Sequence, residues 1–539
     1  MKGATMNAIL TLLDTTGIQQ YVFGSNRLRE NIGASELVAQ ATNIWPREIV
    51  RAIGSHNLLD DNRYDDSRRI EAGDLDAEIV YAGGGNTVML FADISRAREF
   101  AGRYSRQLIQ DAPGLEAVLT HQPINLAIPG SLKDALNTAF RTLSLKKGTR
   151  LRSLPVLGLG VTAACQSTGM PANQYDQDGR AVSNAVMQKI VWSDLARERL
   201  KRLVGPITDC GLDIPANFDD FGRTRGEASY IAVVHADGNG MGRRFQAVID
   251  DTPDNREAIQ ALRKLSMGVN EAGQRALRRV SETLLAMWEP KRRRLADKIA
   301  IAEFMPFRPL VFGGDDVTFV CDGRLGLILT VTYLNEFEQA AKTCMPPNSK
   351  LDPVSACAGI AIVKTHYPFA RAYALAEGLC RNAKQYVRSE TALGEQKSFS
   401  ALDWHFATGG LYGDISAIRA REYVAQWENA TGELVMRPVR LHDHENEWRT
   451  WPRLERVITQ FGEGDWKQKR NKVIGLREPL RNGRDAVRKY RDTYGLELLP
   501  ELSQQLPDLQ ETGWYGNRCG YFDAIEALDF YLKPTKGDA

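Results

Sequence analysis

Several features that would narrow the function at once are missing from this sequence of 539 residues. Its seven cysteines are scattered and form no CxxC pair, which argues against a zinc ribbon and against a disulfide framework. No apolar run approaches the ~20 residues of a membrane-spanning helix. The N-terminal stretch has too short an apolar core, interrupted by Asp14, for a signal peptide. Dispersed thiols fit a reducing compartment, so we expect a cytoplasmic protein without a membrane partner.

A strong overall charge is missing as well. The formal net charge is only +2, so bulk electrostatics calls for neither a nucleic acid nor a membrane surface, and any basic site must be local. The densest basic stretch is residues 466–491, "WKQKRNKVIGLREPLRNGRDAVRKYR". This segment either binds RNA or a partner subunit through phosphate-type contacts or forms a solvated helix face.

Two parts of the chain resemble each other. In each, an apolar run of strand length ends at an aspartate: Asp14 in "AILTLLDTTGIQQYVF" (8–23) and Asp237 in "YIAVVHADGNGMGRRF" (230–245). Each run is followed by a glycine-rich hairpin, "VYAGGGNTVMLF" (80–91) or "LVFGGDDVTFV" (310–320). Because the hairpin glycines align in two registers, the correspondence is one of elements and not of residues.

A further pair of segments completes the repeat. "VLGLGVTAACQSTGMPA" (156–172) and "SACAGIAIVKTHYPFA" (355–370) each predict a strand, a turn and then a helix, and these helices carry Lys189 and Lys384. We infer an internal duplication in an α+β chain, with helices packed on one face of each sheet. From about residue 426 the pattern is mostly helical and rich in tryptophan, which predicts a third, α-helical domain.

The adjacent acids Asp315 and Asp316 are the first candidate site. Two carboxylates at the tip of a tight hairpin repel each other, and a turn needs only one of them; alone, "GGDD" also fits a solvated acidic turn. Asp237 ends a predicted strand. A sheet that places this strand beside the hairpin brings three carboxylates together, which suits Mg²⁺ or Mn²⁺, as one ion or as two ions ~3.5–4 Å apart.

The residues after Asp237 offer bare backbone to a phosphate. "GNGMG" (238–242) could present N–H donors to a triphosphate, and Lys384 could reach the same phosphates as a point charge, although it also fits an exposed helix lysine. A calcium loop is excluded because its twelfth position, which must be glutamate, is Val248. The dinucleotide fingerprint GxGxxG is absent.

These strings together resemble the large polymerase/cyclase subunit of type III CRISPR effector complexes. The resemblance rests on "LLDTTGIQQYVFGSNRLRENIGASELV", "YAGGGNTVMLF", "ADGNGMG" and "GGDD". It covers roughly residues 7–195 and 226–410. It implies two tandem palm domains of the ferredoxin-like βαββαβ type, a degenerate palm at 1–195 and a palm with GGDD at 226–425. A linker (196–225) separates them, and a C-terminal helical domain (426–539) follows.

The resemblance also implies an activity and its residues. Such subunits join ATP into cyclic oligoadenylate messengers of antiviral defence, and two ATP molecules face each other between the palms. Carried over by position, catalysis and metal binding fall to Asp237, Asp315 and Asp316, and nucleotide binding falls to Gly238, Asn239, Gly240, Gly313, Gly314, Lys384, Gln19 and Ser35.

The chain departs from the family pattern in several places. Asn239 stands where the family often has a second acid; its amide oxygen can still bind a metal, but without charge. The first palm reads "GGGN" and lacks the acid pair, so we expect it to hold no catalytic metal. The zinc-binding cysteine cluster is missing, with Cys165 as its relic, and we expect no His-Asp nuclease domain before the first palm.

Two other functions remain open from the sequence. One is a cyclic dinucleotide synthase related to the GGDEF cyclases, which share the hairpin but usually dimerise to present two half-sites. The other is a scaffold subunit of an RNA-guided complex that binds ATP without turnover, which Asn239 keeps open. The internal duplication favours the oligoadenylate cyclase, because it supplies both palms in one chain.

Overall fold

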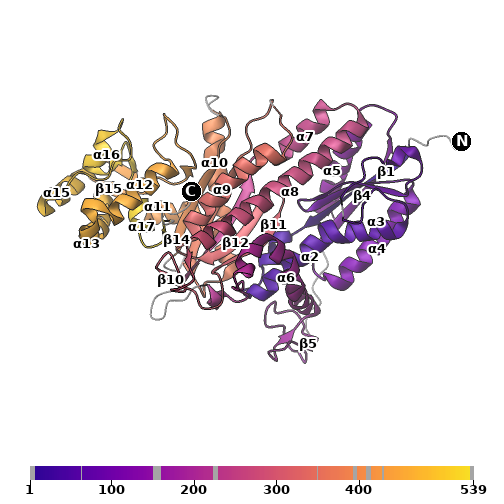
Figure 1. Cartoon of the computed structure of the whole chain (residues 1–539), viewed down its shortest axis with the longest axis horizontal. Helices are drawn as coiled ribbons and strands as arrows, with labels where there is room; N and C mark the ends of the chain where they lie inside the picture. The colour runs from indigo at the N-terminus through magenta and orange to yellow at the C-terminus, as the bar shows by residue number, and fades with distance from the viewer. Residues whose placement is uncertain are drawn as a thin grey trace.

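The structure is a computed structural model that describes residues 7–61, 63–149, 160–221, 229–348, 350–392, 397–407, 414–427 and 430–533. The chain is α+β, with several sheets arranged along an elongated molecule from the N-terminal sheet to the C-terminal helices (Figure 1). Within these ranges no helix combines the length and the apolar character needed to cross a membrane.

The N-terminal sheet has four strands in the order β2-β3-β1-β4, and all neighbours are antiparallel. The chain passes through it as strand, helix, two strands, helix, strand. Its elements are β1 (Asn7–Thr16), α1 (Ile18–Phe23), α2 (Leu28–Ala39), η1 (Gln40–Ile44), α3 (Trp45–Ile53), η2 (Ile70–Ala72), β2 (Ala77–Gly83), β3 (Asn86–Phe91), α4 (Ile94–Asp111), β4 (Glu116–Asn125) and α5 (Ser131–Thr149).

The central sheet has six strands in the order β11-β12-β7-β13-β14-β17. Its first four strands repeat the connectivity of the N-terminal sheet. Its elements are β7 (Tyr230–Gly238), α7 (Met241–Asp251), α8 (Asn255–Ala286), β8 (Trp288–Glu289), β9 (Arg294–Leu295), β10 (Ile299–Ala300), β11 (Phe307–Gly313), β12 (Asp316–Asp322), α9 (Gly326–Cys344), β13 (Ala356–Lys364), α10 (Phe369–Ala392), β14 (Ala401–Ala407), α11 (Ile415–Glu422) and β17 (Val439–Arg440).

The central strand β7 is buried on both faces, which is why it reads as a continuous apolar run. Ala232, Val234 and Ala236 pack with residues of α8 and α9 on one face. Ile231 and Val233 pack with residues of α10 and of α2 on the other face. The helix α2 belongs to the N-terminal part, so helices from both parts of the chain cover the two faces of the central sheet. The prediction of helices on one face only is wrong for this sheet.

Each of the two sheets is contacted by a helix from the other part of the chain. The hydroxyl of Ser35 on α2 donates to the carbonyl of Leu310 on β11. Arg263 on α8 donates from Nε to the carbonyl of Val80 on β2 at 3.2 Å. Both carbonyls lie at a register shift of their hairpin, between Pro309 and Val311 or between Ile79 and Tyr81. The second helix after the first strand of each sheet, α2 or α8, is therefore anchored on the hairpin of the other sheet.

The predicted correspondence between residues 156–172 and the segment that contains β13 is wrong. Residues 156–159 lie outside the described residues, and residues 160–163 form a turn and no strand. The strand that pairs with β1, as β13 pairs with β7, is β4. This strand has no clear sequence signal, because it is an edge strand with an alternating burial pattern and no apolar run. The helix equivalent to α10 is therefore α5, and the match of Lys189 to Lys384 does not hold.

The connector and the C-terminal part complete the chain. The predicted C-terminal helices are present, together with a four-stranded sheet of order β15-β16-β19-β18 whose strands are too short for a sequence pattern to reveal. The remaining elements are β5 (Gln174–Tyr175), β6 (Ala181–Val182), α6 (Asn184–Asp209), η3 (Phe218–Asp220), β15 (Val424–Trp427), β16 (Ala430–Glu433), α12 (Trp451–Gly462), η4 (Gly464–Lys469), α13 (Arg470–Gly475), α14 (Arg477–Arg481), α15 (Arg484–Tyr494), α16 (Pro507–Thr512), β18 (Trp514–Tyr515), β19 (Arg518–Cys519) and α17 (Phe522–Ala527).

Several basic side chains of segment 466–491 are used inside the molecule. Arg470 pairs with Asp529. Arg481 donates to the carbonyl of Glu422 at 2.8 Å, and Arg484 donates to the carbonyl of Gly516 at 2.6 Å. These contacts bind the helices α13 to α15 to the rest of the C-terminal part. The binding of RNA or of a partner subunit by this segment stays a prediction.

Candidate active site

The turn between β11 and β12 brings two carboxylates to the end of the central sheet. Gly313 is paired with Asp316 across the turn, and Gly314 has a φ of 84°, a left-handed conformation that favours glycine. Val317 is paired with Ala236 on β7. The next residues along the two strands, Asp316 and Asp237, therefore lie on the same face of the sheet, because side chains alternate along a strand.

Asp315 lies against the end of β7. A Cβ atom on Gly238 would be 2.8 Å from the Cβ of Asp315, so only glycine at 238 leaves room for that side chain. Gly240 has a φ of 67° and precedes α7. The glycines around Asp237 thus shape the backbone beside the acids, and the structure brings Asp237, Asp315 and Asp316 together at one sheet end.

The surroundings of the two hairpin acids disfavour their charge. Removal from water, reinforced by the charge of Asp237, raises the pKa of Asp315 to about 7. The same two causes raise the pKa of Asp316 to about 7. The Oδ1 atom of Asp316 is shielded from solvent and accepts no hydrogen bond. A cation bound beside these acids would stabilise their negative charge, which the protein alone leaves without a sufficient counter-charge.

Lys384 is the cation that the chain itself places here. Its Nζ donates to Oδ2 of Asp237 at 2.5 Å and to the carbonyl of Gly238 at 3.0 Å. Burial of Lys384 disfavours its charge, but the carboxylate of Asp237 outweighs burial and holds the pKa of the ammonium above its usual value. Lys384 thus joins α10 to the acid end of β7.

His235 is a neighbour of the site that sequence reasoning missed. It lies two residues before Asp237 on β7, so its side chain shares the face of the acids. Its Nδ1 lies 3.4 Å from Oδ1 of Asp316 and 3.3 Å from the hydroxyl of Thr318. Burial lowers the pKa of His235, so the ring is neutral at pH 7 and gives Asp316 no counter-charge. The sequence could have indicated His235, because residues two apart on a strand, such as His235 and Asp237, point to the same face.

Asn239 has a structural role in this geometry. Its Nδ2 donates to the hydroxyl of Ser355 at 3.0 Å and to the carbonyl of Phe399 at 3.1 Å. Its backbone N–H donates to the carbonyl of Ser355 at 2.8 Å. The side chain therefore ties the end of β7 to the segments that lead into β13 and β14, a task that a carboxylate cannot perform because it has no donor.

The substitution Asn239→Asp is expected to destabilise the chain by about 1–2 kcal/mol, because it removes two donated hydrogen bonds and turns a carboxylate toward the carbonyl of Phe399. Urea denaturation at pH 7.5 measures the effect. Asn217→Asp, at the start of η3, gives the same change of charge outside the site. An unchanged or raised midpoint for Asn239→Asp would contradict this role.

The N-terminal sheet carries a matching hairpin without acids. Gly83 is paired with Asn86, as Gly313 is with Asp316. This register places Gly85 and Asn86 at the positions of Asp315 and Asp316. The two turns meet, because a Cβ atom on Gly314 would be 3.8 Å from the Cα of Gly84.

The lysine of the site also has an N-terminal counterpart. Nζ of Lys147 on α5 lies 2.5 Å from Oδ2 of Asp14 on β1, which repeats the pair Lys384–Asp237. Sequence reasoning chose Lys189 for this position, but Lys189 donates to the carbonyl of Tyr21 at 2.7 Å. Both sheets thus keep the aspartate–lysine pair, and the acid pair at the hairpin belongs to the central sheet.

Gln19 and Ser35 lie in different surroundings. Gln19 is exposed on α1, and its neighbour Ile18 lies beside the N-terminal hairpin, with Cδ1 3.4 Å from the Cβ position of Gly85. Ser35 is 6% exposed, and its hydroxyl is used by the carbonyl of Leu310. Gln19 is therefore placed near the meeting point of the hairpins, whereas Ser35 belongs to the packing between the two parts.

The side chains at the site are carboxylates, and their oxygen atoms are the type of ligand that a hard divalent cation prefers. Among the described residues no three His, Cys, Asp or Glu side chains converge as a ready-made metal cage. Mg²⁺ usually takes one or two carboxylates and completes its shell with water and substrate phosphates. Asp315 and Asp316 supply that number of carboxyl groups, and the Oδ1 atom of Asp316 accepts no hydrogen bond from the protein.

Comparison with known proteins bears on this arrangement. Residues 230–392 match the model of the Cas10/Cmr2 second palm domain. Among curated proteins no sequence matches the chain.

Solved structures of Csm1 share the fold of nearly the whole chain. The Csm1–Csm4 cassette in complex with cA4 aligns with a TM-score of 0.52 at 13% identity, over 98% of this chain and 69% of that chain. The cassette in complex with pppApApA gives a TM-score of 0.52 at 12% identity, over 98% and 70%. Csm1 of T. onnurineus gives 0.50 at 12% identity, over 97% and 69%. The resemblance to the large polymerase/cyclase subunit of type III CRISPR effector complexes is thereby confirmed, through a Cas10/Cmr2 second palm domain at residues 230–392 and a Csm1-like fold along nearly the whole chain.

Proposed function

We propose that the chain joins ATP into cyclic oligoadenylates, with the central sheet as the catalytic palm and the N-terminal sheet as a second palm that holds the other nucleotide. The observation that carries the proposal is the meeting of two glycine-rich hairpins, of which only the Gly313–Asp316 turn presents an acid pair beside Asp237. Csm1–Csm4 cassettes have been solved with ATP, pppApApA and cA4. These are a substrate, a linear product and a cyclic product of such a reaction.

The residues of the site divide the work as follows. Asp315, Asp316 and Asp237 would hold Mg²⁺ or Mn²⁺, which when bound activates the attacking hydroxyl and offsets the charge of the leaving pyrophosphate. Lys384, now on Asp237, is close enough to the acids to exchange that partner for a phosphate oxygen of the triphosphate. Gly238 and Gly240 keep the backbone beside the acids free of side chains. The acid-free hairpin at Gly83–Asn86 positions the second ATP and holds no metal.

A product assay tests the proposal. The purified chain is incubated with each nucleoside triphosphate and Mg²⁺ or Mn²⁺, with and without copurifying RNA, and the products are identified by mass spectrometry. We expect linear and cyclic oligoadenylates from ATP alone. Cyclic di-GMP from GTP would instead support a GGDEF-like synthase. Binding of ATP without any product under all conditions would support a scaffold subunit and contradict the proposed reaction.

A further inference from the structure

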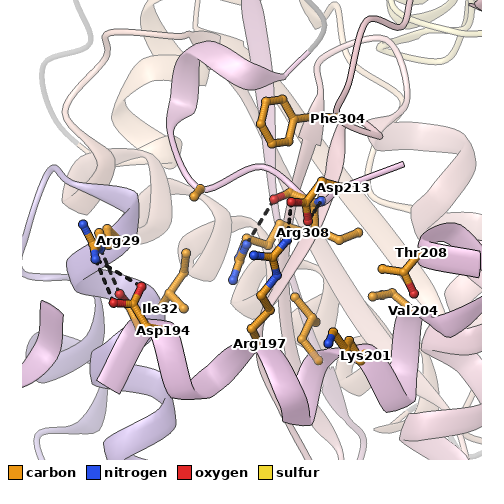
Figure 2. A pocket seen from close by; sticks show the side chains of 14 residues that line it. Arg29, Ile32, Asp194, Arg197, Lys201, Val204, Thr208, Asp213, Phe304 and Arg308 are labelled. Atoms are coloured by element: carbon orange, nitrogen blue, oxygen red, sulfur yellow. Dashed lines mark hydrogen bonds and ion pairs between the residues drawn. The ribbon is translucent and has the colours of Figure 1, made fainter. Parts of the chain in front are cut away.

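A pocket opens at the other end of β11, away from the hairpin acids. It lies between α6, the start of α2 and the first residues of β11 (Figure 2). Arg308, in its floor, precedes Gly313 by five residues, roughly 16 Å along an extended strand. Figure 2 shows Arg29 and Asp194 on one side of the pocket and Lys201 and Thr208 on the other, with Arg197 and Arg308 between them.

The pocket has an excess of positive charge. Four of its lining residues are cationic, Arg29, Arg197, Lys201 and Arg308, and two are acidic, Asp194 and Asp213. Lys201 is also paired, at 2.9 Å, with Glu198, which does not line the pocket. Both acids already have partners. Asp194 lies 2.9 Å from Nη2 of Arg29. Asp213 accepts from Arg197 through one oxygen and from its neighbour's backbone N–H, at 2.8 Å, through the other.

Arg308 is buried here without a counter-ion of its own. It is only 6% exposed. Its Nη1 donates to the carbonyl of Pro215 at 2.7 Å, but its Nε is buried and has no hydrogen-bond partner. Burial lowers the pKa of Arg308 to about 10, and the nearby charge of Arg197 acts in the same direction against the opposing charge of Asp213. An unpaired donor of a buried guanidinium is costly to the fold.

The N-terminal sheet has a buried charged residue at the position equivalent to Arg308, and there the protein itself supplies the counter-ions. By strand register, Glu78 on β2 corresponds to Arg308 on β11. Glu78 is fully buried, and its carboxylate accepts from Arg256 at 2.6 Å and from Arg263 at 2.8 Å. The charge at position 308 is reversed relative to 78, and the two acids of the pocket, Asp194 and Asp213, are already paired with Arg29 and Arg197.

We propose that this pocket binds a phosphate-class anion, which Arg308 and Arg197 recognise and Lys201 attracts at the rim. A phosphate oxygen would accept from the guanidinium group of Arg308, and guanidinium groups suit phosphate because their planar donors bind two of its oxygens together. Ile32, Leu200, Val204 and Phe304 give the pocket apolar walls. These walls leave a place for the body of a small phosphorylated molecule, such as a nucleoside monophosphate. A ligand here would bridge α2, α6 and the central sheet.

Calorimetric titration of the full chain tests the site, with sodium phosphate and AMP as probes at constant ionic strength. We expect one molecule of phosphate to bind, and Arg197→Gln to weaken it about tenfold, as expected for the loss of one charge-assisted hydrogen bond. Arg308→Gln should abolish binding. If that variant does not fold, Arg197→Gln and Lys201→Gln decide. Arg106→Gln, exposed on α4, is the matched control and should bind like the parent.

The outcomes separate the sources of the anion. Equal affinity for phosphate and AMP would assign the site to a lone phosphate group, and tighter AMP binding would assign it to a nucleotide. The absence of binding of either probe at about 10 mM would mean that any Kd is weaker than millimolar. That result would overturn the proposal. So would binding that the three pocket variants leave unchanged, or that only Lys384→Gln removes, because the anion would then lie at the hairpin acids.

Discussion

Replacement of Asp315 and Asp316 together by asparagine is expected to abolish oligoadenylate synthesis and, at the same time, to raise the free energy of unfolding at pH 8. The loss of product, by about a thousandfold or more, follows from removing the charges that would hold the catalytic cation. The gain in stability follows from the raised pKa of both acids, which is about 7 in the folded chain against an ordinary aspartate value of 3.8.

The sign of the stability effect is fixed by proton linkage. Between pH 4 and pH 7 the folded chain binds more protons at these two sites than the unfolded chain does, so their contribution falls as the pH rises through that window. One shift from 3.8 to about 7 corresponds in principle to about 4 kcal/mol. Because 46% of the Asp316 side chain is exposed, solvent screening reduces the gain we expect from the pair to about 1–2 kcal/mol.

Two measurements check this result against a matched control. Urea denaturation from pH 5 to pH 8.5 should show a falling midpoint for the parent and a flatter profile for the double variant. Mg²⁺ should stabilise the parent at pH 8 and leave the variant unaffected. Asp250→Asn with Asp251→Asn removes an adjacent acid pair that is bonded to Lys133 and Lys350, and it should keep activity and gain no stability. Retained synthesis in the Asp315/Asp316 variant would refute the site.

The hairpin and its neighbouring strand could be predicted from the sequence because local features define them. The turn requires a left-handed conformation at Gly314, and the two acids follow this glycine directly. Asp237 lies at the end of an apolar run that is buried on both faces of the sheet. Each signal lies within a few residues of the element that it defines. The pairing of β7 with β12, which the structure supplies, then places Asp237 beside the hairpin.

The pairing between distant segments could not be read in this way. The edge strand β4 shows only alternate burial, so the sequence pattern favours residues 156–172 as the counterpart of β13 and Lys189 in place of Lys147. Ser35 belongs to a string typical of the family, yet its hydroxyl is bonded to Leu310, 275 residues away. The unpaired Nε of Arg308 depends on α6 and the segment around Pro215, which no local pattern connects to β11.

The substitution Glu78→Gln is expected to have the largest effect on stability, a loss of about 3–5 kcal/mol, because it leaves buried guanidinium groups without their shared carboxylate. Glu78 is fully buried and accepts from Arg256 and Arg263 of α8. Burial opposes its charge, but the two arginines outweigh burial and hold the pKa of Glu78 below its usual value. This stability is present above the unfolded pKa and is lost as the pH falls through the folded pKa.

The contact of Glu78 with α8 also connects the two parts of the chain, so its loss is expected to affect activity as well as stability. Arg263 binds both Glu78 and the carbonyl of Val80 at the bulge of β2, and the same hairpin carries Gly84 to its meeting with Gly314. We therefore expect Glu78→Gln to reduce oligoadenylate synthesis at temperatures where the chain is still folded. Glu99→Gln, in a surface pair with Arg96 and Arg103, should cost less than about 1 kcal/mol. Equal urea midpoints for Glu78→Gln and Glu99→Gln would show that the buried cluster does not hold the two hairpins opposite each other.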